Sequence, residues 1–116
     1  MSDALGPPPD WRRITSVESL PLLGGPARVR VRLTSPQGLL LEIAYSAGTE
    51  SPEHTHQHDS YLYLLGGHLV TTLDGQITEL MPGDALLQPA GTPHGVRAIR
   101  DSHWLEFKSP PMVVWQ

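Results

Sequence analysis

Between Gly48 and Gly67 the sequence reads Gly-Thr-Glu-Ser-Pro-Glu-His-Thr-His-Gln-His-Asp-Ser-Tyr-Leu-Tyr-Leu-Leu-Gly-Gly, with histidines at alternate positions. Side chains two residues apart in an extended strand point to the same face, so we expect His54 and His56 to project into a common space. A further imidazole, His94, lies in a second stretch framed by glycine and proline. Two histidines from one strand and one from a distant strand predict a metal site.

The composition limits the possible size of the fold, the possible metal ligands and the possible partners. A chain of 116 residues is long enough for one domain with a buried core. The absence of cysteine excludes disulfides and thiolate ligands, so nitrogen and oxygen atoms must hold the metal. A net charge of -4 without a basic patch argues against nucleic acid. Neither a membrane span nor a signal peptide is recognisable, which predicts a cytoplasmic protein without a membrane partner.

Alternating apolar and polar residues predict short strands along most of the chain. The predicted strands cover residues 27–33, 38–47, 61–65, 68–73, 76–80, 85–88, 94–99 and 103–108. Turn signals separate them: Asp74-Gly75 predicts a tight hairpin, and Gly66-Gly67 and Arg100–Ser102 are expected to end strands. Many short strands without a convincing helix predict an all-β barrel or a two-sheet sandwich.

Two spaced motifs resemble those of the cupin family. The first is Gly48-x5-His-x-His56 and the second is Gly83-x5-Pro-x-Gly-x2-His94, where x is any residue. Fifteen residues between the motifs suit the spacer of that family, and the resemblance covers roughly residues 37 to 108. It implies a small single-domain cupin of the RmlC-like kind, whose jelly-roll barrel (a double-stranded β-helix) holds a metal inside one mouth.

The chain departs from the cupin pattern at two positions. Ser60 stands where the family has a metal-binding Glu or Gln, and Ala98 where an Asn often follows the second motif. Three neutral imidazoles leave the charge of a divalent ion uncompensated and up to three coordination positions open. Such a site favours an anionic chelating substrate, such as an enolate, a carboxylate or a thiolate. Ser60, Asp59 and His58 are the candidates for a fourth ligand.

The expected cofactor is one divalent metal per chain: Fe, Zn, Ni or Mn. Tyr63 and Glu106 are the candidate catalytic residues, and Gln88 is a further candidate polar group of the pocket. Strand parity does not decide whether Gln88 or its neighbours face inward. We assign no role to the remaining histidines, His68 and His103.

The resemblance implies a metal-dependent enzyme that acts on a small molecule. One form is an Fe(II) dioxygenase with a three-His centre, in which the substrate chelates the iron. The other uses the metal as a Lewis acid for isomerase, cyclase or lyase chemistry. The alternative is a cupin that binds a small molecule without turning it over.

We expect three segments: an N-terminal arm and peripheral strand (1–26), a cupin barrel (27–108) and an apolar C-terminal tail (109–116). Apolar residues gather in both end segments, including Trp11, Val17 and Leu20 in the first and Met112 to Trp115 in the last. Together they would form a large exposed patch on a monomer. We therefore expect a homodimer.

Overall fold

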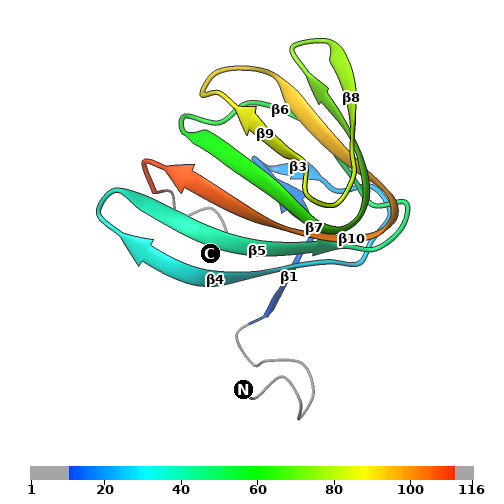
Figure 1. Cartoon of the computed structure of the whole chain (residues 1–116), viewed down its shortest axis with the longest axis horizontal. Coiled ribbons are helices and arrows are strands. Elements are labelled where there is room, and N and C mark those ends of the chain that lie inside the picture. The colour runs from blue at the N-terminus through cyan, green and yellow to red at the C-terminus, as the bar shows by residue number, and fades with distance from the viewer. Residues whose placement is uncertain (1–10, 112–116) are drawn as a thin grey trace.

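The computed structural model describes residues 11–111, and its regular elements are all β-strands (Figure 1). The strands are β1 (Arg12–Ile14), β2 (Ser16–Val17), β3 (Leu20–Pro21), β4 (Ala27–Ser35), β5 (Gly38–Tyr45), β6 (Glu50–His54), β7 (Asp59–Leu73), β8 (Gln76–Leu80), β9 (Ala85–Gln88) and β10 (His94–Ser109). This confirms the all-β prediction. The described part of the chain has no helix that is long and apolar enough to cross a membrane. Residues 1–10 of the predicted arm and 112–116 of the predicted tail lie outside the described range.

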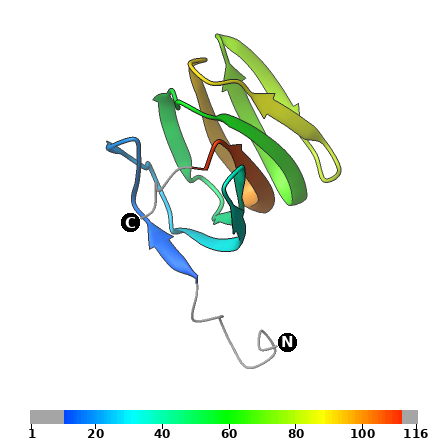
Figure 2. The ribbon, with the colours of Figure 1, turned by 90° about the vertical axis from the view of Figure 1, so that its left-hand side faces the viewer.

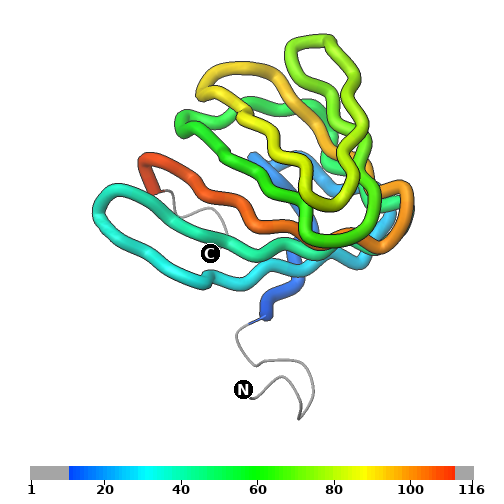
Figure 3. The backbone as a smooth tube through the Cα atoms, viewed as in Figure 1, coloured from blue at the N-terminus to red at the C-terminus, as the bar shows by residue number. Residues whose placement is uncertain are grey.

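Two long antiparallel strands, β7 and β10, connect the halves of the barrel. The C-terminal half of β10 pairs with β5 and with the first half of β7, whereas its N-terminal half pairs with β6 and the second half of β7. Strands β4 and β1 extend the sheet beyond β5, and β8 and β9 pair with β7. Figures 1 and 3 show the resulting arrangement, in which the long strands bend at one side and β6 and β8 face β4 and β5, while β9 lies beside the first half of β7.

The predicted strand ends at Gly66-Gly67 and Arg100–Ser102 were wrong, because both segments are bends inside continuous strands. The register between β7 and β10 shifts there. Gly67 has a φ of 97°, and a Cβ at this position would collide with Asp101 and Ser102. The Ser102 hydroxyl accepts a hydrogen bond from the His68 amide at 2.9 Å and donates one to the Arg100 carbonyl at 2.7 Å. Glycine and serine therefore bend the strands without ending them.

Alternate side chains of β5, β7 and β10 fill the barrel. The buried core comprises Ile14, Ala27, Val29, Leu39, Leu41, Ile43, Tyr45, Leu62, Leu64, Leu69, Leu80, Val96, Ala98 and Trp104. Burying one large apolar side chain contributes about 1.5–3 kcal/mol to the free energy of folding. The same alternation on β10 that buries Trp104 also buries Glu106 and Lys108. The interior is therefore apolar with one charged wall.

Candidate metal centre

The structure brings together the three histidines predicted as metal ligands. His54 ends β6 and lies directly opposite His94, the first residue of β10, so the two side chains share a face. His56 follows two residues after His54, beyond the end of the strand. One ligand atom from each ring lies within 4.8 Å of the other two. The strand pairing thus explains how residues forty positions apart form one cluster.

Each ring of this three-His cluster is oriented by a hydrogen bond at Nδ1. His54 Nδ1 donates to the Pro52 carbonyl oxygen at 2.7 Å, and His94 Nδ1 donates to that of Thr92 at 3.0 Å. His56 Nδ1 is 2.7 Å from the Oε2 of Glu18. Because these partners are acceptors, the Nδ1 atoms carry the protons, and each Nε2 keeps its lone pair for a metal.

The spacing of the His54 and His56 Nε2 atoms fits a bound cation. His54 Nε2 and His56 Nε2 are 3.1 Å apart, and neither carries a proton that could join them. Two lone pairs at this distance repel each other unless a positive ion lies between them. Metal–nitrogen distances of about 2.0–2.1 Å place neighbouring ligand nitrogens about 2.8–3.4 Å apart in octahedral or tetrahedral geometry. The residues present therefore suit a divalent metal.

Burial favours the neutral form of His56 and His94, which metal ligation requires. Burial first, and then the nearby Lys108 ammonium, lower the pKa of His56 from 6.5 to about 3. Burial also lowers the pKa of His94 below its ordinary value. Protons therefore compete weakly with a metal at these two rings near neutral pH.

Glu18 reaches His56 from a hairpin that the sequence did not reveal as part of the site. Strands β2 and β3 pair through a two-residue turn in which Glu18 and Ser19 have φ values of 50° and 66°. Positive φ at both positions is the type I′ geometry, usually marked by Asn or Gly, so Glu-Ser gave no signal. Figure 2 shows this N-terminal hairpin beside β6, which it contacts. It also buries Val17 against the histidines.

The three candidates for a fourth ligand all have other partners. Asp59 Oδ1 accepts a hydrogen bond from the Ala90 amide at 2.8 Å, in the turn after β9. Ser60 Oγ and His58 Nε2 are each 3.1 Å from Lys108 Nζ. Neither Asp59 nor His58 belongs to the metal-ligand group found within residues 11–111. The group that could hold a metal therefore consists of three imidazoles.

Beside it lies a second buried group, the lysine cluster, made of Lys108, Glu106, Ser60 and His58. Lys108 is the only lysine of the sequence, and it is 1% exposed. Its Nζ donates to Glu106 Oε2 at 2.5 Å, and Trp104 Nε1 donates to Glu106 Oε1 at 2.9 Å. Burial alone would raise the pKa of Glu106, but the Lys108 charge and these hydrogen bonds outweigh it and hold the pKa at about 2. Glu106 is therefore ionised near neutral pH.

Members of both clusters line a cavity of about 30 Å³. Its walls include the three histidines together with Gln88, Glu106 and Lys108. Glu106, one of the two predicted catalytic residues, thus faces the candidate metal site. Tyr63, the other, is 46% exposed, and its side chain points away from the face that buries Leu62 and Leu64. Gln88 faces inward and is 2% exposed.

The remaining histidines lie apart from the cavity. His68 Nε2 is 2.7 Å from Glu79 Oε1 at the surface, and His103 is exposed on β10. This placement agrees with the absence of any role for them in the sequence-based interpretation.

Comparison with known proteins identifies the fold. The family model described as cupin domain matches residues 41–107, more than half of the chain. This chain belongs to the cupin family. No curated protein is significantly similar to this cupin in sequence.

Solved structures of other proteins superpose on this chain. KdgF from Halomonas sp. is 28% identical, with a TM-score of 0.70 over 72% of this chain and 78% of that one. An RmlC-like cupin from Shewanella frigidimarina is 24% identical, with a TM-score of 0.72 over 83% and 84%. Salicylate 1,2-dioxygenase from Pseudoaminobacter salicylatoxidans, solved with gentisate, is 17% identical, with a TM-score of 0.68 over 71% of this chain and 24% of that one. The last two show a shared fold only.

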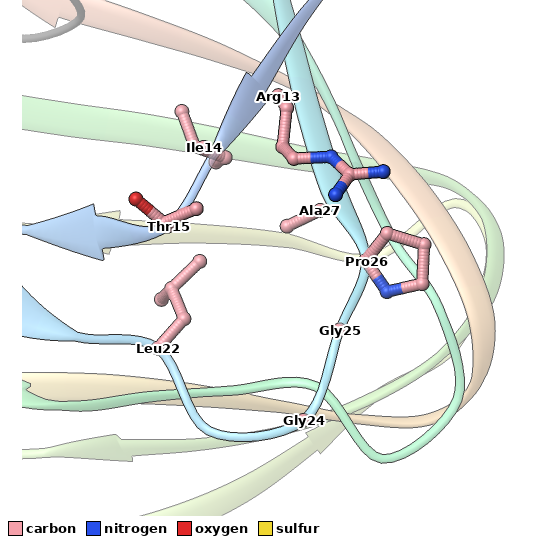
Figure 4. Close-up of a pocket in the computed structure, with 8 residues that line it drawn as sticks. All are labelled: Arg13, Ile14, Thr15, Leu22, Gly24, Gly25, Pro26 and Ala27. Atoms are coloured by element: carbon pink, nitrogen blue, oxygen red, sulfur yellow. The ribbon is translucent and has the colours of Figure 1, made fainter.

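A larger pocket, of about 360 Å³, lies on this cupin away from the histidines (Figure 4). It is bordered by β1 and by the segment that leads from Leu22 to Ala27. Arg13 supplies the only charged side chain among the described residues that line it. With one guanidinium and no other titratable group, this pocket offers less chemistry than the cavity that both clusters line.

Proposed function

We propose that this cupin is a mononuclear metal-dependent enzyme whose substrate is a small, anionic organic molecule that chelates the metal. The observation that carries the proposal is the convergence of three neutral imidazole nitrogens without a carboxylate ligand. A divalent ion held by His54, His56 and His94 keeps its full charge and retains open positions. An anion with two oxygen donors would compensate the charge of the ion and fill two of its open coordination positions.

The lysine cluster favours the Lewis-acid form of this chemistry, an isomerase, cyclase or lyase reaction. A bound metal would polarise a carbonyl or hold an enolate. Lys108 places a buried ammonium at the wall of the same cavity, where it can stabilise negative charge that develops on the substrate. Glu106, with a pKa of about 2, is too weak a base to remove a proton near neutral pH. We assign it to positioning Lys108.

A dioxygenase of the three-His type is the second candidate. The absence of a carboxylate ligand favours it, because such a centre leaves positions for both a chelating substrate and dioxygen. The salicylate 1,2-dioxygenase neighbour shares the fold at 17% identity and supports nothing more specific. The two forms differ in their need for oxygen.

The test begins with elemental analysis of protein purified without chelator or added metal. Metal-free protein is then reloaded with Fe, Zn, Ni or Mn and screened against small oxo, hydroxy and unsaturated acids, in air and under nitrogen. Turnover under nitrogen with a redox-inert metal supports the Lewis-acid form, and turnover that needs Fe and air supports the dioxygenase. A His103→Ala variant is the matched control. Tight binding of an acid without turnover by any metal form would instead identify a binding protein.

We also propose that the protein is a homodimer. An outer apolar row crosses five neighbouring strands, with one residue from each. Its members are Leu33 of β4, Leu40 of β5, Phe107 of β10, Tyr61 of β7 and Leu87 of β9. All but Leu40 are exposed. A second copy presenting the same row would cover it. Light scattering at micromolar concentration should give twice the chain mass, and Phe107→Lys should give the monomer mass; a monomeric wild type would contradict the proposal.

A further inference from the structure

We propose that Gln88 is the residue that selects the ligand of this cavity, because its side-chain amide donates a hydrogen bond to an oxygen of the metal-chelating molecule. The inference rests on the proposed function, since it concerns the same site. It adds a specificity residue and narrows the ligand to small carboxylates that carry a second oxygen donor on the adjacent carbon, as 2-oxo and 2-hydroxy acids do.

Gln88 belongs to a polar row that crosses three neighbouring strands. On β9 it lies directly opposite Ser60 of β7, which in turn lies opposite Lys108 of β10. All three side chains point inward and are at most 2% exposed. The row therefore presents hydroxyl, ammonium and amide groups along one wall of the barrel.

The members of this row differ in what they bind. The three protons of Lys108 Nζ are taken up by Glu106, Ser60 and His58. By contrast, Gln88 Nε2 is the one buried side-chain nitrogen or oxygen of the described residues that has no hydrogen-bond partner. An unpaired buried donor destabilises the folded state, and folded proteins rarely keep one. A ligand oxygen in the cavity would supply the missing acceptor.

The size and charge of the cavity indicate which oxygen this is. A volume of about 30 Å³ is room for roughly two waters, or for one carboxylate group. The three-His cluster, once loaded, and Lys108 make this space positive, with Glu106 as the buried counter-charge. The amide of Gln88 adds a donor but no charge. A carboxylate or carbonyl oxygen fits these conditions, whereas an amine or another donor does not.

Two variants separate a ligand-binding role from a structural one. Gln88→Leu keeps a similar volume and removes the unpaired amide, so the metal-free variant should unfold at a higher temperature than wild type. The metal-loaded variant should bind ligand more weakly, by about ten-fold or more. Gln88→Glu replaces the donor with an acceptor of negative charge and should bind more weakly still. Gln76→Leu, the same substitution at an exposed position of β8, is the matched control and should change neither property.

The experiment uses pyruvate, glycolate and oxalate as probes, titrated by calorimetry into Ni-loaded protein, with metal content and thermal unfolding measured alongside. The inference is supported if wild type binds a probe and Gln88→Leu binds it more weakly. Gln88→Leu should also keep its full metal content and unfold at a higher temperature. Equal affinity in wild type and Gln88→Leu, a lower unfolding temperature, or loss of metal from Gln88→Leu would each overturn it while leaving the proposed function standing. Metal-loaded wild type that binds none of the three probes would reject the substrate class in the proposed function, and the inference with it.

Discussion

The three-His cluster and the lysine cluster occupy one barrel interior, yet they handle buried polarity in opposite ways. In the lysine cluster a positive and a negative side chain neutralise each other, and each proton of the ammonium has an acceptor. In the three-His cluster the Nδ1 protons are satisfied, but the Nε2 lone pairs converge on each other. The first cluster is complete with the chain alone, whereas the second needs a cation from outside.

This difference predicts that the two clusters fail separately. Damage to the three-His cluster should remove the metal and leave the fold, because neutral imidazoles are tolerated without an ion. Damage to the lysine cluster should weaken the fold, because it exposes an uncompensated charge to an apolar interior. The variants below test the contrast.

The largest effect is expected from His54→Ala/His94→Ala, which removes two of the three ligands. Metal content after dialysis should fall from one ion per chain to nearly none, because a lone imidazole binds a divalent metal weakly. Unfolding of the metal-free protein should change little. The control His68→Ala/His103→Ala removes two histidines outside the cavity and should retain the ion. Full occupancy of the first variant would refute the ligand assignment.

Lys108→Met should destabilise the fold by about 3–5 kcal/mol, because it leaves the Glu106 carboxylate buried without its counter-charge. Urea unfolding of metal-free protein measures the loss. Adding Glu106→Gln to Lys108→Met removes the unpaired negative charge and should restore a large part of the lost stability. If the double variant is as unstable as the sum of the two single variants, the pair does not act as a unit.

Acid should act on the buried His56 ring, whose pKa is lowered from 6.5 to about 3, before it acts on Glu106. The pKa of Glu106 is held at about 2, below its value of 4.5 in an unfolded chain, so its contribution is present in full above pH 4.5. That contribution, about 3 kcal/mol at most, is lost as the pH falls from 4.5 toward 2. The free energies of unfolding of metal-free wild type and Glu106→Gln should therefore converge as the pH falls through this window. Parallel curves for the two proteins would show that Glu106 is not the titrating group.

Glu18→Ala should weaken metal binding by about 10–100-fold, because the carboxylate orients the His56 ring through Nδ1. Glu18→Gln keeps an oxygen acceptor and should lose less. Competition with a coloured chelator gives the affinities. Equal affinities in wild type and Glu18→Ala would mean that the hairpin carrying Glu18 covers the site without holding His56.

Ser60→Ala should have the smallest effect, a loss of about 1–3 kcal/mol in stability from one hydrogen bond to the Lys108 ammonium. Metal affinity should not change, since the serine oxygen serves the lysine. The same chelator competition checks this. A large drop in affinity would make Ser60 a fourth ligand and join the two clusters into one.

The sequence predicted what local patterns encode. Alternation placed the strands, and two motifs placed His54, His56 and His94 near one another. The bends at Gly67 and Ser102 were mistaken for turns because glycine and serine promote both, and only cross-strand pairing tells them apart.

The lysine cluster and the Glu18 contact escaped prediction for a related reason. From sequence, Lys108 resembles an ordinary surface residue at the end of a strand. Its partners come from β7, from the turn before β7 and from β10 itself. Glu18 meets His56 through a turn with no marker residue, across thirty-eight positions of sequence. The periodicity of one strand predicts which side chains point inward. It does not predict which residues of other strands they contact.

Strand β10 begins with His94, a candidate metal ligand, and reaches Lys108 near its other end, so one continuous backbone carries residues of both clusters. Its amides pair with β5, β6 and β7 and exchange with deuterium only when those ladders open. An ion at His94 would bind only while the ladders are closed. Its binding free energy would then add to the free energy needed to open the amides on the far half of the strand. Slowed deuterium uptake around Leu105 on adding metal would report occupancy of a site at the opposite end of β10.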